Sequence, residues 1–240
     1  MLYRWSKLLV CWALIGLLAA CGGSSGPVGD PGDGGGDDGG GDDGGGGPPP
    51  SPFTAPSEQQ ALYYINDLPS DLDAVQATFN QGGFTPLADL PLSNAVAYDG
   101  FMEVLFTSTP NANITSSATF TVNMLTGETL GSATNFMGMV YNSEADANEL
   151  ALYEGGVNFV GGTLSTGALT EANIAIQIDG AFDNGLQELT VAGEIDGKIF
   201  GPAADGLYAS GSYFGLGQDI TLIADGVPVY GSATLWALKD

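Results

Sequence analysis

Apolar residues recur at every second position in several short segments of the second half of the chain. The pattern is clearest in residues 120–124 and 174–178, and it returns more weakly in residues 189–195 and 220–222. Because successive side chains of a β-strand point to opposite faces, each segment predicts a strand with one buried and one solvated face.

These segments amount to about eight strands, near residues 94–106, 118–125, 129–137, 151–160, 172–180, 187–199, 206–214 and 219–237, the last of them broken at Gly226. Short turn signals such as Asp183-Asn184-Gly185 favour antiparallel pairing of consecutive strands. An eight-stranded meander can close into a barrel without exposed edges. The sequence therefore predicts a mainly β fold: an eight-stranded antiparallel up-and-down β-barrel over residues 94–240, preceded by one or two short helices.

The interior of such a barrel is just wide enough to be filled by side chains. Large aromatic residues in or beside the predicted strands are the candidates for this filling: Phe101, Phe106, Phe120, Phe136, Phe159, Phe182 and Trp236.

Residues 53–93 have the pattern of a short helical segment that packs on the barrel and caps one end of it. Ser57 and Gln60 have the spacing of a capping box, and Ser70 with Asp73 suggests a second helix start. The apolar residues expected on the buried helix faces are Ala61, Leu62 and Ile65 in the first helix, and Leu72, Val75 and Phe79 in the second.

The N-terminal segment has the pattern of a secretory signal. Arg4 and Lys7 precede an apolar stretch, and Leu18-Ala19-Ala20 leads directly to Cys21. This arrangement resembles a bacterial lipoprotein signal, which implies that residues 1–20 are removed and that Cys21 carries the lipid. Residues 21–52 are mostly Gly, Asp, Pro and Ser, so we expect a disordered tether. The protein is therefore expected in the bacterial cell envelope, lipid-anchored to the outer membrane and exposed at the surface or facing the periplasm.

Net charge and residue types narrow the classes of function. The net charge is −24, and after removal of the signal only Lys198 and Lys239 stand against 28 acidic residues, so nucleic acid is an unsuitable partner. The chain has no histidine, which excludes Ser-His-Asp catalysis and the usual zinc sites. Glu188 and Glu194 could be imagined as a glycosidase pair, but they alternate onto a solvated strand face. We expect no enzyme activity, no metal and no cofactor.

The sequence Gly197-Lys-Ile-Phe-Gly-Pro-Ala-Ala-Asp205, followed by the Gly-rich strand Gly206–Phe214, resembles the C-terminal barrel signature of the transferrin-binding protein B family. A hairpin over residues 119–132 resembles an earlier hairpin of that family. Two departures are Asp205-Gly206 at the acidic turn and Tyr208-Ala209 where the family has a glycine pair. The chain also has room for one barrel and not for two lobes, so the resemblance implies the barrel and a surface location more directly than transferrin binding.

The predicted function is that of an outer-membrane or surface lipoprotein whose barrel binds a protein or small ligand through its loops, expected near residues 107–117 and 139–147. A structural envelope protein without a dedicated ligand is the alternative. The membrane is a partner only through the lipid anchor. Tyrosines can either build a binding face or fill and line the barrel, and both readings stay open: Tyr63, Tyr64, Tyr98, Tyr141, Tyr153, Tyr208, Tyr213 and Tyr230.

Overall fold

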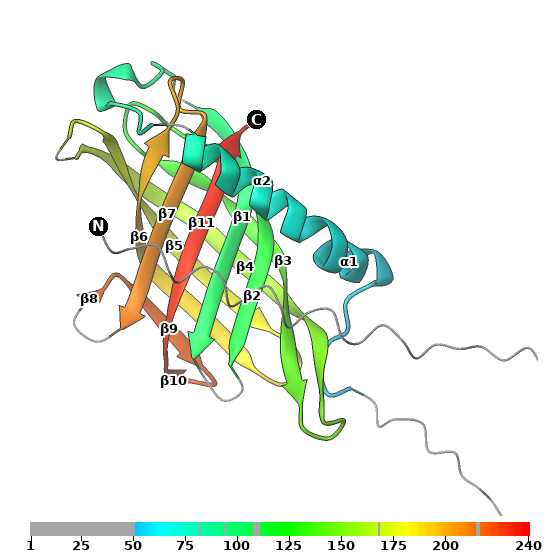
Figure 1. Cartoon of the computed structure of the whole chain (residues 1–240). Coiled ribbons are helices and arrows are strands. Elements are labelled where there is room, and N and C mark those ends of the chain that lie inside the picture. The colour runs from blue at the N-terminus through cyan, green and yellow to red at the C-terminus, as the bar shows by residue number, and fades with distance from the viewer. Residues whose placement is uncertain (1–50, 82, 94, 108–110, 168, 215–216) are drawn as a thin grey trace, which may run out of the picture. The chain divides into compact units, whose positions relative to one another are not determined.

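The computed structural model describes residues 51–81, 83–93, 95–107, 111–167, 169–214 and 217–240 (Figure 1). The predicted signal peptide, Cys21 and the predicted tether up to residue 50 lie outside these ranges. None of the helices in the described ranges has the length and apolar character needed to cross a bilayer.

Eight strands of one antiparallel sheet close into a barrel, as predicted. Around the wall they follow the order β1 to β7 and then β11, which pairs with both β7 and β1. The barrel strands are β1 (Val96–Thr107), β2 (Ala112–Val122), β3 (Thr129–Asn142), β4 (Ala147–Thr166), β5 (Ala172–Asp183), β6 (Glu188–Phe200), β7 (Gly206–Phe214) and β11 (Tyr230–Lys239). Three short strands lie between β7 and β11: β8 (Gly217–Gln218), β9 (Ile220–Ala224) and β10 (Val227–Pro228).

The last predicted strand, residues 219–237, is in fact divided among β9, β10 and β11, and β9 and β11 have different places in the wall. β9 pairs with β6, along the part of β6 that β7 does not reach, whereas β11 closes the barrel against β1. The predicted break at Gly226 is confirmed. Asp225 (φ 50°) and Gly226 (φ 78°) both adopt the left-handed conformation of a tight hairpin turn, which reverses the chain between β9 and β10.

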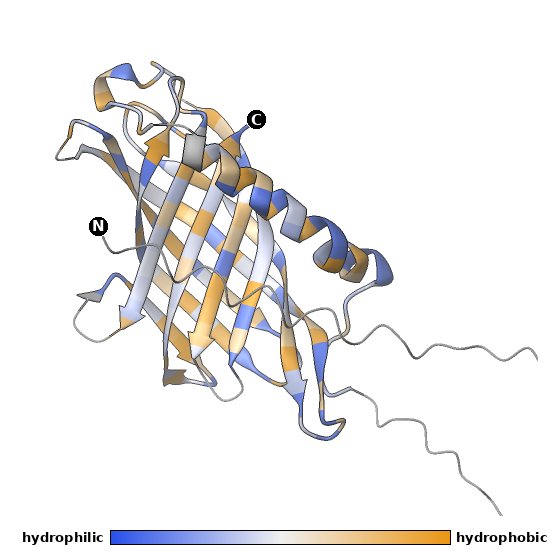
Figure 2. Ribbon diagram, viewed as in Figure 1, coloured by the Kyte–Doolittle hydropathy of each residue, from blue (hydrophilic) through white to orange (hydrophobic). Residues whose placement is uncertain are grey.

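The interior of the barrel holds a continuous apolar core. Along the strands, apolar and polar residues alternate between the two faces of the wall (Figure 2). Inside, the rings of Tyr98, Phe120 and Phe159 follow each other with centroid distances of 5.5 and 5.2 Å, and Phe182 contacts Phe136 at 4.7 Å. Such edge-to-face and stacked contacts stabilise the core beyond simple burial of area.

A single helical segment precedes the barrel. It consists of α1 (Glu58–Leu62), the π-helix η1 (Tyr63–Asp67) and α2 (Leu68–Gln81), which follow each other without a break. The predicted capping box is confirmed: the Gln60 amide N–H donates to Ser57 Oγ at 3.3 Å, and the Ser57 N–H donates to Gln60 Oε1 at 2.9 Å. The predicted second start at Ser70 is wrong, because the chain passes through the wider π turn instead of leaving the helix.

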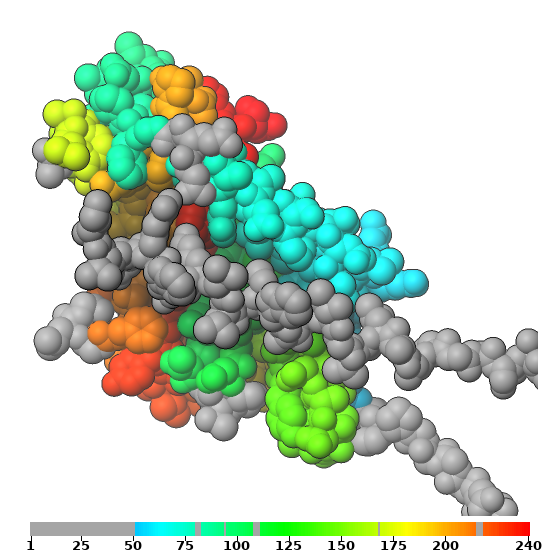
Figure 3. Space-filling model, viewed as in Figure 1, coloured from blue at the N-terminus to red at the C-terminus, as the bar shows by residue number. Residues whose placement is uncertain are grey.

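The helical segment lies across the outer wall of the barrel, over β1 and β11, and does not cap its end (Figures 1 and 3). Buried Leu68 and Val75 pack against Phe101, with Trp236 partly buried beside them. Phe101 and Trp236, predicted to fill the interior, therefore point outward, where they give the apolar stripe of α2 a partner.

Of the two predicted apolar faces of the helical segment, the second is confirmed and the first is wrong at two positions. The stripe of Leu72, Val75 and Phe79 is confirmed as the barrel-facing side of α2. Leu62 and Ile65, predicted to be buried, are more than half exposed. The π turn shifts the spacing of side chains, so Tyr63 and Tyr64 face the barrel in their place.

Other residues close the two ends of the barrel. Near the β5–β6 turn, Phe53 belongs to the interior core, and the Thr54 N–H donates to the Asn184 carbonyl at 2.7 Å. At the opposite end, Leu90 follows the 3-10 helix η2 (Leu87–Asp89) into the core, and the Thr85 N–H donates to the Ile199 carbonyl at 2.9 Å.

Candidate binding site

The two segments predicted as long recognition loops are mostly strands. β2 already begins at Ala112, and β3 continues to Asn142, so only a four-residue turn separates β3 from β4. Asn142 shapes this turn because its Oδ1 accepts hydrogen bonds from the N–H groups of Glu144 and Ala145 at 3.0 and 3.3 Å. In the described part of these segments, most of the exposed surface therefore lies on strand faces and on the turn at residues 143–146.

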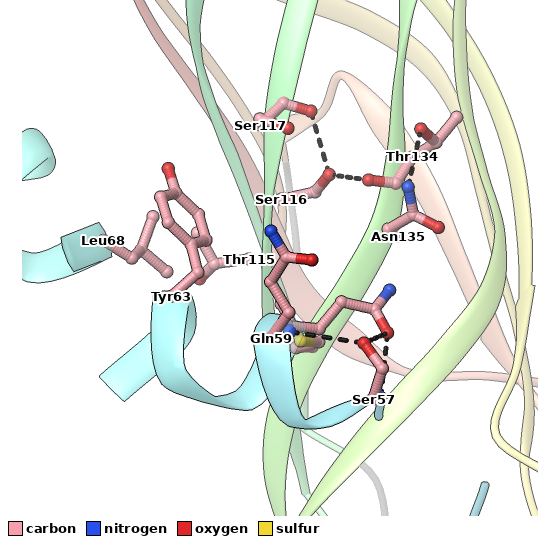
Figure 4. Close-up of a pocket in the computed structure, with 11 residues that line it drawn as sticks. Ser57, Gln59, Tyr63, Leu68, Thr115, Ser116, Ser117, Thr134 and Asn135 are labelled. Carbon is pink, nitrogen blue, oxygen red and sulfur yellow. Dashed lines mark hydrogen bonds between the residues drawn. The ribbon is translucent and has the colours of Figure 1, made fainter. Parts of the chain in front are cut away.

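A hollow of about 270 Å³ lies between the start of the helical segment and the outer wall at β2 and β3 (Figure 4). We call it the helix–wall hollow. Leu68 and Met137 supply apolar surface, and Tyr63 supplies an aromatic ring. Most of the remaining lining consists of hydroxyl and amide side chains: Gln59, Gln60, Ser116, Ser117, Thr134 and Asn135.

The pairing of the wall strands is irregular at this point. The β2–β3 register shifts between Thr115 and Ala118, and the β3–β4 register shifts between Thr134 and Phe136. Asn135, which takes part in both shifts, has φ 61°, a left-handed conformation that asparagine adopts more readily than most other residues with a Cβ. The sequence carries a trace of this bulge, since Thr134-Asn135 followed by Phe136-Met137 breaks the alternation.

Part of the polar lining is held in place by hydrogen bonds. The Ser116 hydroxyl, in a nearly buried side chain, donates to the Thr134 carbonyl across the two strands. Asn135 Nδ2 lies 3.4 Å from Thr134 Oγ1. By contrast, the Gln59 amide and the Ser117 hydroxyl have no hydrogen-bond partner among the residues that the structure describes.

Tyr63 is the first residue of the π-helix and faces the hollow (Figure 4). Its hydroxyl donates to Asp71 Oδ2 at 3.3 Å. Burial, and then the charge of Asp71, raise the pKa of the Tyr63 hydroxyl, so the ring is neutral at physiological pH. None of the eleven residues that line the hollow carries a charge.

The Gly-Pro sequence of the resemblance forms the connection between β6 and β7. Gly201 has φ 82°, and a Cβ at this position would lie 2.4 Å from Asp205 Oδ2, so only glycine fits. The Thr85 hydroxyl donates to the Gly201 carbonyl, and the Lys239 N–H donates to the Asp205 carbonyl at 2.9 Å. These hydrogen bonds hold the turn against Thr85 and Lys239, so the Gly-Pro sequence of this chain has a structural role at the end of the barrel.

Two hydroxyls inside the barrel belong to structural tyrosines. Tyr98 donates to the carbonyl of Ala204, in the same β6–β7 connection, at 2.7 Å. Burial, and to a lesser degree the charge of Asp205, raise the pKa of Tyr98, and burial raises the pKa of Tyr153 to about 12. Tyr141 and Tyr230 are instead about half exposed on the outside. The tyrosines are thus divided between the filling role and the outer surface.

The spacing of Glu188 and Glu194 does not suit a glycosidase pair, which the sequence already disfavoured. Glu188 and Glu194 lie on β6 six residues apart, which is about 20 Å along a strand, far beyond the separation in glycosidases. Lys198 Nζ forms an ion pair with Glu171 Oε1 at 2.8 Å and lies 4.4 Å from the centre of the Phe84 ring. In the described ranges no group of three or more Asp, Glu, Cys or His side chains is placed to hold a metal ion.

The predicted lipid site, Cys21, lies outside the described residues, and the hollow was not foreseen from the sequence. The resemblance of the Gly-Pro turn to the transferrin-binding protein B family stays a prediction. Comparison of the chain with protein-family models, with curated proteins and with solved structures finds no match.

Proposed function

We propose that this chain is a lipoprotein, anchored through Cys21 to the bacterial outer membrane, whose β-barrel binds a protein partner. The partner contacts the outer face of the β3–β4 hairpin. The signal pattern, Cys21 and the Gly/Asp-rich tether support the anchor. Gly22 stands where an aspartate often favours retention in the inner membrane, which supports the outer membrane. The resemblance to single barrels of the transferrin-binding protein B family supports the same location.

The hairpin extends beyond the closed part of the wall. The pairing of β3 with β2 ends at Gly138, and the pairing of β4 with β5 begins only at Glu154. Residues 139–153 therefore pair as strands only with each other, although the Leu152 N–H donates to the Thr54 carbonyl at 2.9 Å and the inner face of the hairpin joins the core. Figure 3 shows the tip of the hairpin as a projecting lobe. A projecting lobe on a rigid barrel is accessible to a large partner.

The outer face of this hairpin carries apolar residues. Met139 is 46% exposed and Tyr141 50% exposed, and Leu150, directly opposite Met139, is half-buried. We call Met139, Tyr141 and Leu150 the hairpin stripe. Met and Tyr are enriched in protein interfaces, and an exposed apolar patch is typical of a binding surface. The hairpin stripe is the observation on which the proposal depends.

The charges around the hairpin stripe indicate the partner's chemistry. Glu144 and Asp146 are exposed at the tip, and the Tyr141 hydroxyl donates to the Asp146 carboxylate. Because the whole chain is strongly acidic, a partner with an apolar patch and a basic rim is favoured by charge complementarity.

Capture from intact envelopes tests the proposal. The full-length lipoprotein with a C-terminal affinity tag is crosslinked in cells and purified. The wild type is compared with a Met139→Glu, Tyr141→Ser double variant. Leu130→Glu is the matched control, since Leu130 is a 53% exposed apolar residue on the same strand but away from the hairpin. We expect a specific partner with the wild type and the control, and at least about tenfold less with the double variant.

Equal recovery by all three proteins would place the contact elsewhere on the barrel and overturn the role of the hairpin stripe. If the wild type recovers no specific partner, and deletion of the gene weakens the envelope, the structural alternative holds instead.

The anchor has its own test. Cys21→Ser should move the protein from the membrane fraction to the soluble fraction and abolish labelling by radioactive palmitate. Unchanged fractionation and labelling would contradict lipidation at this cysteine.

A further inference from the structure

Two departures from regular secondary structure meet at the helix–wall hollow. η1 places Tyr63 on one side of it. On the other side, the shifts in β2–β3 and β3–β4 pairing both fall on residues 134–136 of β3 and form one bulged stretch. The two features come from distant parts of the sequence.

Each of these features is often associated with functional sites. π-turns inside helices occur frequently at functional sites, and β-bulges occur next to binding sites because they re-aim side chains. The left-handed Asn135 lies within this bulge and lines the hollow. Their coincidence around one hollow points to a ligand site.

The lining indicates the chemical class of the ligand. A hollow without charged residues gives an anion no counter-charge and a cation no carboxylate. Gln59 offers two donors and one acceptor, and Ser117 offers a hydroxyl. Asn135, whose Nδ2 already donates one hydrogen bond to Thr134 Oγ1, offers a second donor and an acceptor. A ligand with several neighbouring hydroxyl groups is complementary to such a surface, because each hydroxyl both donates and accepts hydrogen bonds.

We propose that the helix–wall hollow binds a neutral saccharide, with hydroxyl groups against Gln59, Ser117 and Asn135 and one ring face against Tyr63. A volume of about 270 Å³ is close to the lower limit for small-molecule pockets, which suits a single sugar ring. Leu68 and Met137 provide the apolar surface that the C–H face of a sugar contacts.

This site is separate from the surface in the proposed function. The hollow uses the helical segment and the bulged part of the wall, whereas the hairpin stripe lies farther along β3 and β4. Saccharide binding therefore stands whether or not the hairpin stripe binds a protein.

The test measures sugar binding to the purified full-length protein. Saturation-transfer NMR and calorimetry are run with glucose, galactose and N-acetylglucosamine, with sorbitol as an acyclic control. We expect saturable binding of at least one sugar in the millimolar range or tighter, and weaker binding of sorbitol. Absence of saturable binding for all three sugars would overturn the proposal.

Two variants localise the binding. Asn135→Gly removes the amide and at the same time fits the left-handed backbone, so the fold should be kept while affinity falls at least about tenfold. Gln59→Leu should weaken binding to a similar extent, because it removes an amide that holds no other group in place. Asn158→Ala, an exposed amide on the outer face of β4, is the matched control and should bind as the wild type does.

Unchanged affinity in both hollow variants would overturn the site. So would loss of sugar binding in the Met139→Glu, Tyr141→Ser double variant with retention in Asn135→Gly. Thermal unfolding of every variant separates lost affinity from lost structure.

Discussion

The inner face of the barrel wall and its outer face differ in how their apolar residues are organised. Inside, residues from every barrel strand form one continuous cluster, which includes Phe120 and Phe182. Outside, the largest buried contact is a small cluster of Leu68, Val75 and Phe101 that fixes the helical segment. The interior therefore supplies stability, while the outer face offers separate places for recognition: the helix–wall hollow and the hairpin stripe.

The largest effect should come from the interior. Phe120 lies between the rings of Tyr98 and Phe159 and is 4% exposed. Phe120→Ala leaves a cavity, so we expect a loss of about 3–5 kcal/mol in the free energy of unfolding. Urea unfolding followed by circular dichroism measures it. A loss below about 1 kcal/mol would show that the interior is looser than these contacts indicate.

A substitution in the cluster of Leu68, Val75 and Phe101 should disrupt the helical segment and leave the barrel folded. Val75→Asp places a carboxylate between the helix and Phe101, and because burial of an unpaired charge costs several kcal/mol, the helical segment should detach instead. We expect faster hydrogen exchange in residues 58–81 with little change in the barrel strands. Equally faster exchange in the barrel would contradict the division between the two faces. The exposed neighbour Ala74 provides the control Ala74→Asp.

A smaller effect is expected at the barrel end. Tyr98→Phe removes the hydroxyl that donates to the Ala204 carbonyl and leaves that buried acceptor without its partner. We expect a loss of about 1–2 kcal/mol in the free energy of unfolding. An unchanged unfolding midpoint would mean that this hydrogen bond does not stabilise the β6–β7 turn.

The smallest effect concerns Glu171 and Lys198. The hydrogen bond from Lys198 lowers the pKa of Glu171, although Lys198 is 35% exposed and the pair is partly screened by solvent. The ionised pair therefore stabilises the fold above the ordinary carboxyl pKa of about 4.3, and this contribution disappears as the pH falls through the lowered pKa.

Glu171→Gln removes this dependence. We expect the melting temperature of the wild type to fall more steeply than that of Glu171→Gln as the pH drops below about 4. Parallel pH curves for the two proteins would contradict a role for the pair in acid stability. Glu194→Gln, on the exposed wall, is a control for the loss of one charge.

The alternation in the sequence was sufficient to predict the closed barrel because a strand records its buried face in every second residue. Prediction from the alternation failed at the bulge, where the alternation is broken, and at positions where the outer face of a strand also carries large apolar residues. The break at Thr134-Asn135 marks a bulge, yet the neighbouring strand at Ser116 and the helix that completes the hollow come from other parts of the chain. Phe101 and Trp236 have the size of interior residues, and only the position of α2 explains why they point outward.

The sequence by itself determined the number of barrel strands, their antiparallel order, the capped helix start and the acidic character of the surface. These properties depend on neighbours in the chain, such as the period of two in residues 174–178 and the pairing of Ser57 with Gln60. The tertiary structure decided which face the helical segment covers, how β9 and β11 divide the end of the chain, and where the helix–wall hollow lies. Those features depend on contacts between residues far apart in sequence, and such contacts leave no periodic pattern in the chain.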